Sequence, residues 1–206
     1  NSLSEVGTME DYLRWLTNVV AQSGGGHIQP LYGIGREQKL TEEIVEGLPG
    51  YRGQGPVRRG NQASDHFQHD VYGNIVLGAA QSFHDHRLLQ RAGQTEFLKL
   101  EAVGEHAIRV HDQPDAGMWE LRTRARVHTS SVLMCWAACD RLSKIAHALG
   151  LPQRAQYWSR HAYEMRERVL KEAWNEQRQA FAESLGGRDL DASVLLMAEV
   201  GFIEPT

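Results

Sequence analysis

Apolar residues recur three and four positions apart through most of this chain, which is the spacing of helices that bury one face. The pattern predicts helices over 9–20, 62–80, 96–110, 129–149, 152–174 and 190–200. Weaker patterns predict a helical turn over 40–45 and a short strand over 180–182. Strands and helices do not alternate, so the sequence predicts an all-α fold. Periodicity alone leaves a bundle, an α-solenoid and part of an α/α toroid as alternatives.

The clearest of these helices covers 129–149. Three hydroxyl residues at its start, Thr129, Ser130 and Ser131, are candidate N-cap residues. At its end, Gly150 followed by Pro152 is typical of a helix terminus. Its apolar stripe contains Val132, Cys135, Trp136, Cys139, Leu142, Ile145, Ala146 and Leu149. The next helix carries apolar residues on one face and Arg and Glu on the other, which predicts that only one face is buried.

Composition narrows the class of protein. The chain has 206 residues, enough for one domain or two small ones, with 41% hydrophobic residues and a mean hydropathy of -0.46. No apolar run is long enough to span a bilayer, so we expect no membrane partner. The formal net charge of -4 offers no broad attraction for a phosphate backbone, so we expect no nucleic acid partner.

Cysteine and histidine usage predicts neither a disulfide framework nor a metal site. Cys135 and Cys139 lie four apart in an apolar helical pattern, and we interpret them as reduced core thiols. Since the sequence also opens without a secretory leader pattern, we expect a cytoplasmic protein. His66 and Asp70 would share one helix face, but the spacing of the His and Asp residues fits no zinc or calcium signature. We therefore expect no metal and no other cofactor.

One segment, 112–120, brings chemically useful residues together. Trp119 and Glu120 follow a sharp turn that Pro114 and Gly117 favour. An indole can cover the apolar face of a sugar ring, and apolar surroundings favour the protonated form of a carboxylic acid, which can then protonate a leaving oxygen. This indicates a carbohydrate site. The alternative is a surface turn with one exposed acid and a half-buried indole.

Other polar residues near these patterns have simpler interpretations. Asp112 and Asp115 are expected only to shape their loop, for instance by hydrogen bonding to their own backbone. The segment 47–60 is rich in Gly and Arg and too broken for a helix interior. It is either a functional loop or a solvated basic one.

Four blocks of the sequence, taken in order, resemble one enzyme family. They read LPGYRGQGPVRRGN at 48–61 with QHDVYG at 68–73, PDAGMWELR at 114–122, SVLMCWAACDR at 131–141 and LDASVLLMAEVGF at 190–202. Each is similar to a block of bacterial glycoside hydrolase family 15, which includes glucoamylases, glucodextranases and some trehalases. Val132 departs from the pattern, because the family often has Lys at this place.

The resemblance implies a fold. The family fold is an (α/α)6 barrel of twelve helices, so we expect residues 1–206 to form a single partial catalytic domain of about six or seven helices. This would be an incomplete toroid that lacks the N-terminal and C-terminal parts of the family fold. Helix faces left uncovered would promote self-association. The family's RDA-like block and the later block that carries its general base are not found in the sequence.

The resemblance also implies an inverting hydrolase that acts on an α-glucoside, of glucoamylase or trehalase type. Glu120 would be the general acid, and Trp119 would flank the leaving group. Arg58 and Asn61 would border the sugar pocket, and Arg122 would be a further substrate contact. Because inversion needs a second carboxylate, we expect this chain alone to be inactive. The alternative is a non-catalytic helical module that keeps the family fold as a structural or binding partner.

Overall fold

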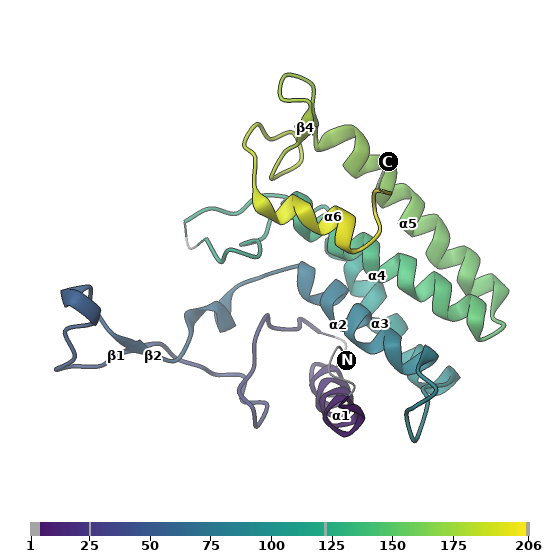
Figure 1. The fold of residues 1–206 in the computed structure, drawn as a ribbon, viewed down its shortest axis with the longest axis horizontal. Helices are drawn as coiled ribbons and strands as arrows, with labels where there is room; N and C mark the ends of the chain where they lie inside the picture. The colour runs from purple at the N-terminus through teal and green to yellow at the C-terminus, as the bar shows by residue number, and fades with distance from the viewer. Residues whose placement is uncertain (1–4, 25, 122, 205–206) are drawn as a thin grey trace. The chain divides into compact units, whose positions relative to one another are not determined.

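The computed structural model describes residues 5–24, 26–121 and 123–204. The α-helices in these ranges are α1 Val6–Gln22, α2 Asp70–His84, α3 Gln94–Val110, α4 Thr129–Ala148, α5 Pro152–Glu172 and α6 Leu196–Glu199 (Figure 1). Short 3₁₀ helices cover Tyr51–Gly53, Gln62–Asp65 and Ala192–Leu195. Two short antiparallel strand pairs are β1 Glu43–Ile44 with β2 Arg58–Arg59, and β3 Trp174–Asn175 with β4 Ala180–Phe181. The predicted all-α class is confirmed.

The chain divides into two compact units. The larger unit holds the described residues up to Ile28 and from Gln68 onward, and contains α1 to α6. The smaller unit is Gln29–Phe67 and contains β1 and β2. In the larger unit α2 packs on α3 and α4 packs on α5, and both α2 and α3 also contact α4. These neighbouring helical hairpins agree with the predicted incomplete α/α toroid.

α4 is the central helix of the larger unit. Every residue from Thr129 to Cys139 is buried, so this half of the helix is enclosed on all sides. A helix buried all round belongs to the interior of a fold. α5 differs, since it buries one face and exposes charged residues on the other; the buried residues are Trp158, Ala162, Met165 and Val169. α4 is therefore an inner helix, and α5 covers it from outside.

Two glycines let the helices approach closely. A Cβ atom on Gly73 of α2 would lie 2.2 Å from the carbonyl oxygen of Met134 in α4. On Gly104 of α3, it would lie 2.3 Å from the Leu142 side chain and 2.6 Å from the Trp158 ring. Atoms in a close-packed interior do not come this near, so a larger residue at either place would push the helices apart.

The predicted limits of the two longest helices are confirmed to within two residues. α4 ends at Ala148, and Gly150 takes the left-handed φ of 71° that is typical after a helix. Pro152 then begins α5, at a position where its missing N–H is no loss. The short strand predicted over 180–182 is β4.

Two local predictions are wrong. The segment 40–45 does not form a helical turn, because β1 pairs there with β2, and Arg59 Nη2 lies 2.6 Å from Glu43 Oε2 across the pair. His66 and Asp70 do not share a helix face, since α2 begins only at Asp70 and His66 has extended backbone with a ψ of 149°. Apolar spacing within a short window does not register a strand pair between distant segments.

The N-terminus of α4 also differs from the prediction. His128 is the N-cap residue, and its side chain makes no capping hydrogen bond. The hydroxyl of Thr129 instead donates to the carbonyl oxygen of Ala182 at 2.7 Å. The hydroxyl of Ser131 donates to Asp115 Oδ2, also at 2.7 Å. The hydroxyl groups at 129 and 131 thus join the helix to two other segments.

Candidate active site

The segment that carries Trp119 and Glu120 is a loop closed at its base. Asp115 and Arg126 pair across this base as an isolated antiparallel bridge. The nitrogen of Asp115 lies 2.9 Å from the oxygen of Arg126, and the reverse pair is 3.2 Å apart. We call this segment the 115–126 loop. The bridge joins its two ends directly before α4, which places the residues between them on a fixed base.

The side chain of Asp115 anchors the same base to the helices. It is 2% exposed, and its Oδ2 accepts hydrogen bonds from the backbone N–H of His69 at 2.8 Å and from Ser131 Oγ at 2.7 Å. We predicted that Asp115 would only shape its loop, for instance by hydrogen bonding to its own backbone. Its side chain instead ties the loop to the beginnings of α2 and α4. A buried carboxylate with two donors is strongly held, because either donor left out would leave it poorly solvated.

A polar cluster surrounds this anchor. Burial and the neighbouring charge of Asp115 raise the pKa of Asp70 to about 6. Burial lowers the pKa of His69, although Asp115 opposes the shift. Burial also raises the pKa of the Cys135 thiol, whose Sγ lies 3.4 Å from the carbonyl oxygen of His69. Cys135 and Cys139 are both free and buried, so their interpretation as core thiols is confirmed.

Gly117 lies where a side chain would be strained and would meet a neighbouring ring. Its φ is 66°, in the left-handed region, and a Cβ atom on it would lie 2.7 Å from Cδ2 of the His128 ring. The His128 ring is itself buried, with Nδ1 3.3 Å from Glu183 Oε2. The turn at Gly117 therefore packs directly on the His128 ring, which in turn contacts the carboxylate of Glu183.

Glu183 is the centre of an ion network that the sequence did not reveal. It is 6% exposed, its Oε1 lies 3.0 Å from Arg124 Nη2, and it also pairs with Arg126 Nη1. Backbone hydrogen bonds join the same segments, from Thr129 N to Glu183 O at 2.9 Å. Glu183 thus links the β3–β4 hairpin to the returning side of the 115–126 loop. The signal in the sequence was a run of basic residues before α4, but local spacing does not point to an acid that lies 57 positions from Arg126.

Trp119 and Glu120 lie between these anchors. Glu120 is partly buried and has a φ of 56°, a conformation that costs a non-glycine residue free energy and that is frequent at functional sites. Trp119 is 54% exposed, and its indole N–H donates to Asp191 Oδ1 at 2.9 Å. The same oxygen accepts from the backbone N–H of Ser193 at 2.8 Å. Two of the sequence blocks, 114–122 and 190–202, therefore meet at this contact.

The other predicted site residues do not belong to the described part of the larger unit. Arg58 and Asn61 belong to the smaller unit, where Arg58 Nη1 lies 2.7 Å from Glu42 Oε1. Asn61 Oδ1 accepts from Ala63 N at 2.9 Å and caps a 3₁₀ helix. Arg122 lies outside the described residues. The roles of these three residues stay predictions.

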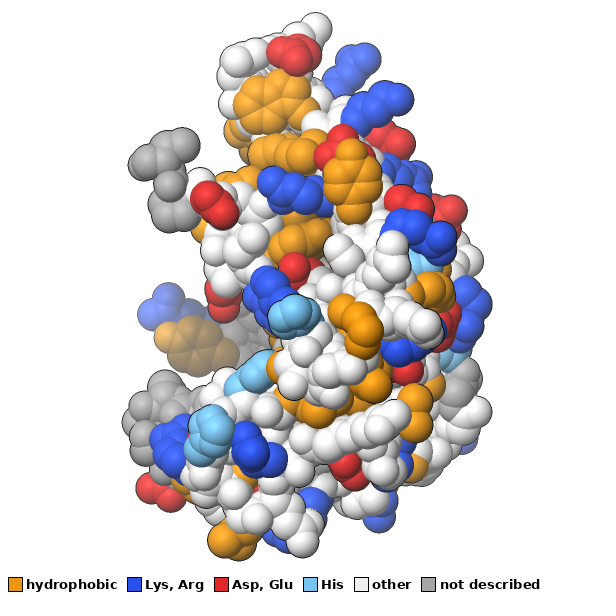
Figure 2. All heavy atoms as spheres, turned by 90° about the vertical axis from the view of Figure 1, so that its right-hand side faces the viewer, with side chains coloured by type: hydrophobic (Ala, Val, Ile, Leu, Met, Phe, Trp, Pro, Cys, Tyr) orange, Lys and Arg blue, Asp and Glu red, His pale blue; other side chains and the backbone are white. Residues whose placement is uncertain are grey.

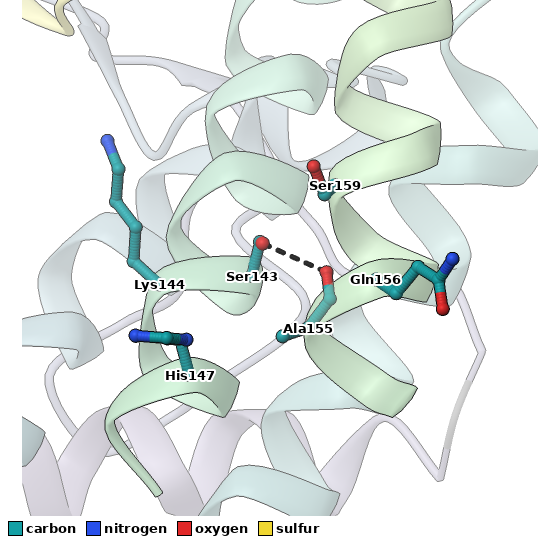
Figure 3. Close-up of a pocket in the computed structure, with 6 residues that line it drawn as sticks. All are labelled: Ser143, Lys144, His147, Ala155, Gln156 and Ser159. Atoms are coloured by element: carbon teal, nitrogen blue, oxygen red, sulfur yellow. Dashed lines mark hydrogen bonds between the residues drawn. The ribbon is translucent and has the colours of Figure 1, made fainter. Parts of the chain in front are cut away.

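A groove on the surface of α4 and α5 lies away from the loop. It has a volume of about 490 Å³ and is lined by Ser143, Lys144, His147, Ala155, Gln156 and Ser159 (Figure 3). Ser143 lies about 21 Å along the axis from the first residue of α4, at 1.5 Å per residue. None of the described residues that line the groove carries a carboxylate, and Ser143 Oγ already donates to the carbonyl oxygen of Ala155 at 3.0 Å. We assign it no part in the candidate chemistry.

Other surface features bear on the expected partners. Within the described ranges, no three His, Cys, Asp or Glu side chains gather where they could hold a metal ion. No helix in the part of the chain that the structure describes is long and apolar enough to cross a membrane. Figure 2 shows a face on which small hydrophobic patches alternate with charges of both signs. Self-association through such patches stays a prediction.

Comparison with known proteins places this sequence in a family. The sequence pattern described as glycosyl hydrolases family 15 matches residues 3–206, nearly the whole chain. The chain belongs to this family. It is 34% identical over 199 residues to a trehalase of Mycobacterium tuberculosis, covering 95% of this chain and 28% of that protein. No solved structure matches it.

Other relatives of this family 15 chain carry the same name. A trehalase of Mycolicibacterium smegmatis is 34% identical over 197 residues, covering 94% of this chain and 29% of that protein. A trehalase of Thermoplasma volcanium is 28% identical over 206 residues, covering 98% of this chain and 32% of that protein. The chain thus spans about three tenths of the length of these relatives.

Proposed function

We propose that this chain is the acid-bearing part of an inverting glycoside hydrolase that cleaves an α-glucosidic bond, with trehalose as the first substrate to test. Membership of family 15 and similarity to proteins named trehalase support the reaction class. The observation that carries the proposal is the adjacency of Glu120 and Trp119 in a loop closed by the Asp115–Arg126 bridge. We further propose that residues 1–206 form part of one catalytic domain that works in the cytoplasm.

In this proposal Glu120 donates a proton to the glycosidic oxygen. A second carboxylate, on the opposite face of the sugar, activates water, and the two groups stand ~6.5 to 9.5 Å apart so that the water fits between them. Trp119 covers an apolar face of the sugar beside the leaving group. Arg58, Asn61 and Arg122 donate hydrogen bonds to sugar hydroxyls, a use that suits guanidinium and amide groups.

The second carboxylate is the part of the proposal that the chain does not supply. The block that carries the family's general base is not found in its sequence, and the trehalases of which it covers 28% and 29% are much longer. We propose that the base lies outside these 206 residues. Without the general base, hydrolysis by the chain alone would be slower than hydrolysis by a form that contains it, by roughly 10²- to 10⁴-fold, which is the usual contribution of general base catalysis.

The test is release of glucose from trehalose, maltose and isomaltose. It compares the 206-residue chain with a longer form that carries the remaining family blocks. We expect only the longer form to release glucose, with inversion at the anomeric carbon by NMR, and Glu120→Gln to lower its kcat by roughly 10²- to 10⁴-fold. Glu167→Gln, on the exposed face of α5, is the matched control and should keep full activity.

Two results would contradict separate parts of this proposal. Full activity of Glu120→Gln in the longer form would remove Glu120 as the general acid. Turnover by the 206-residue chain that Glu120→Gln abolishes would instead show that both carboxylates lie within it. If no form hydrolyses a glucoside, the alternative of a non-catalytic helical module stands.

A further inference from the structure

The indole of Trp119 is held more firmly than its exposure suggests. It is 54% exposed, yet its N–H donates to Asp191 Oδ1 at 2.9 Å across 72 positions of sequence. An exposed tryptophan ordinarily has several χ1 and χ2 rotamers open to it. A hydrogen bond to the ring nitrogen restricts both torsions at once, because the N–H direction lies in the plane of the ring.

Asp191 is itself fixed in place. Its backbone is extended, with φ -147° and ψ 144°, and its Oδ1 also accepts from the backbone N–H of Ser193 at 2.8 Å. Burial raises the pKa of Asp191, but the hydrogen bonds from Ser193 and Trp119 outweigh it and leave the pKa below its usual value. The carboxylate is therefore ionised at neutral pH, and a charged acceptor makes a stronger hydrogen bond than a neutral one.

We propose that Asp191 is a positioning residue that fixes the plane of the Trp119 ring, so that a flat apolar surface is ready for a sugar beside Glu120. This inference rests on the proposed function. Asp191 acts through Trp119 and does not touch the sugar. Its worth to binding is the freedom that the indole has already lost before the sugar arrives, which for one immobilised side chain corresponds to roughly two- to tenfold in affinity.

The first test needs no enzymatic activity. The indole N–H resonance of Trp119 is assigned in the 206-residue chain with Trp119→Phe, and is then followed in Asp191→Ala and Asp191→Asn. We expect Asp191→Ala to shift this resonance and speed its exchange with solvent several-fold. Asp191→Asn should have a smaller effect because an amide oxygen still accepts. Asp189→Ala, which removes an exposed carboxylate two positions away, is the control and should change nothing.

The second test measures the consequence for a glucoside in the form that hydrolyses it. We expect Asp191→Ala to raise KM roughly two- to tenfold and to change kcat by less than about twofold, as loss of uniform binding does. An unchanged indole resonance in Asp191→Ala overturns the inference, and so does a shifted resonance with an unchanged KM. Absence of hydrolysis by every wild-type form contradicts the proposed function instead, while the resonance still decides whether Asp191 holds the indole.

Discussion

The hydroxyl of Ser131 donates a 2.7 Å hydrogen bond to the buried carboxylate of Asp115, which joins the 115–126 loop to the first turn of α4. Ser131→Ala should leave that carboxylate one donor short, at about 1–3 kcal/mol in the free energy of unfolding. Urea denaturation measures this loss of stability. Ser159→Ala, an exposed serine on α5, is the control and should stay within about 0.5 kcal/mol of wild type. Equal effects of the two substitutions would refute the anchor.

Gly117 and Gly150 separate backbone strain from steric clash. Both have a left-handed φ, 66° and 71°, but a Cβ atom would meet the His128 ring only at Gly117, whereas at Gly150 it would meet nothing within 4 Å. We expect Gly150→Ala to lose about 1–2 kcal/mol from strain alone. Gly117→Ala should lose more, since the ring must also move. Denaturation curves that coincide for the two variants would show that the ring gives way freely.

The negative charge of Glu183 should contribute to the stability of the fold. Glu183→Gln leaves the guanidinium groups of Arg124 and Arg126 without a charged partner, but both are about two-fifths exposed. We therefore expect a loss of about 1–3 kcal/mol, below the 3–5 typical of a fully buried pair. Glu172→Gln, which removes an exposed partner of Arg168 on α5, should lose under about 1 kcal/mol. If Glu183→Gln loses no more stability than Glu172→Gln, the ion network does not stabilise the fold.

Asp70 predicts a specific dependence of stability on pH. Its folded pKa of about 6 is raised above the unfolded value, so the folded state holds the proton more tightly, and the contribution to stability is lost as pH rises from about 4 to 6. Because the side chain keeps some contact with water, we expect a change on the order of 1 kcal/mol. His69, whose pKa burial lowers, changes stability in the opposite direction as pH rises toward 6.5.

The contribution of Asp70 is therefore measured as the difference in the free energy of unfolding between wild type and a variant that lacks its carboxyl group. The free energy of unfolding is measured from pH 4 to 7 for wild type and Asp70→Asn, and the gap should move in favour of the variant as pH rises. Subtraction removes the parts due to His69 and other groups that both proteins share. A gap that is constant with pH would contradict the raised pKa of Asp70.

The long helices were the predictable part of this fold. The limits of α4 and α5 were predicted to within two residues because each helix buries an apolar stripe that repeats over many turns. Gly150 and Pro152 also mark the junction between the two helices in the sequence itself. The strand pair β1–β2 was missed because its support comes from ion pairs such as Arg59–Glu43, which join residues 16 positions apart. Local spacing carries no trace of such pairs.

The candidate site also has a part that the sequence predicts and a part that it does not. The proximity of Trp119 and Glu120 follows from their being neighbours in sequence, but the groups that hold them do not. Asp191 reaches Trp119 across 72 positions, and Glu183 reaches Arg126 across 57. These contacts exist only because the packing of α4 brings the hairpin and the C-terminal segment to the same place. From sequence alone, the block at 190–202 marked Asp191 without indicating what it does.

The bridge between Asp115 and Arg126 has a consequence for how this site can change. Because the ends of the loop are joined to each other and to α2 and α4, chain inserted between Glu120 and Arg124 need not move either helix. The entropy of closing a flexible loop grows slowly, by about 0.6 kcal/mol for each doubling of its length. Insertions between Glu120 and Arg124 can therefore reshape the surface that we propose meets a sugar, while the scaffold keeps its stability. Loops of different length grafted at this place would test whether the proposed sugar-binding surface sets a linkage preference.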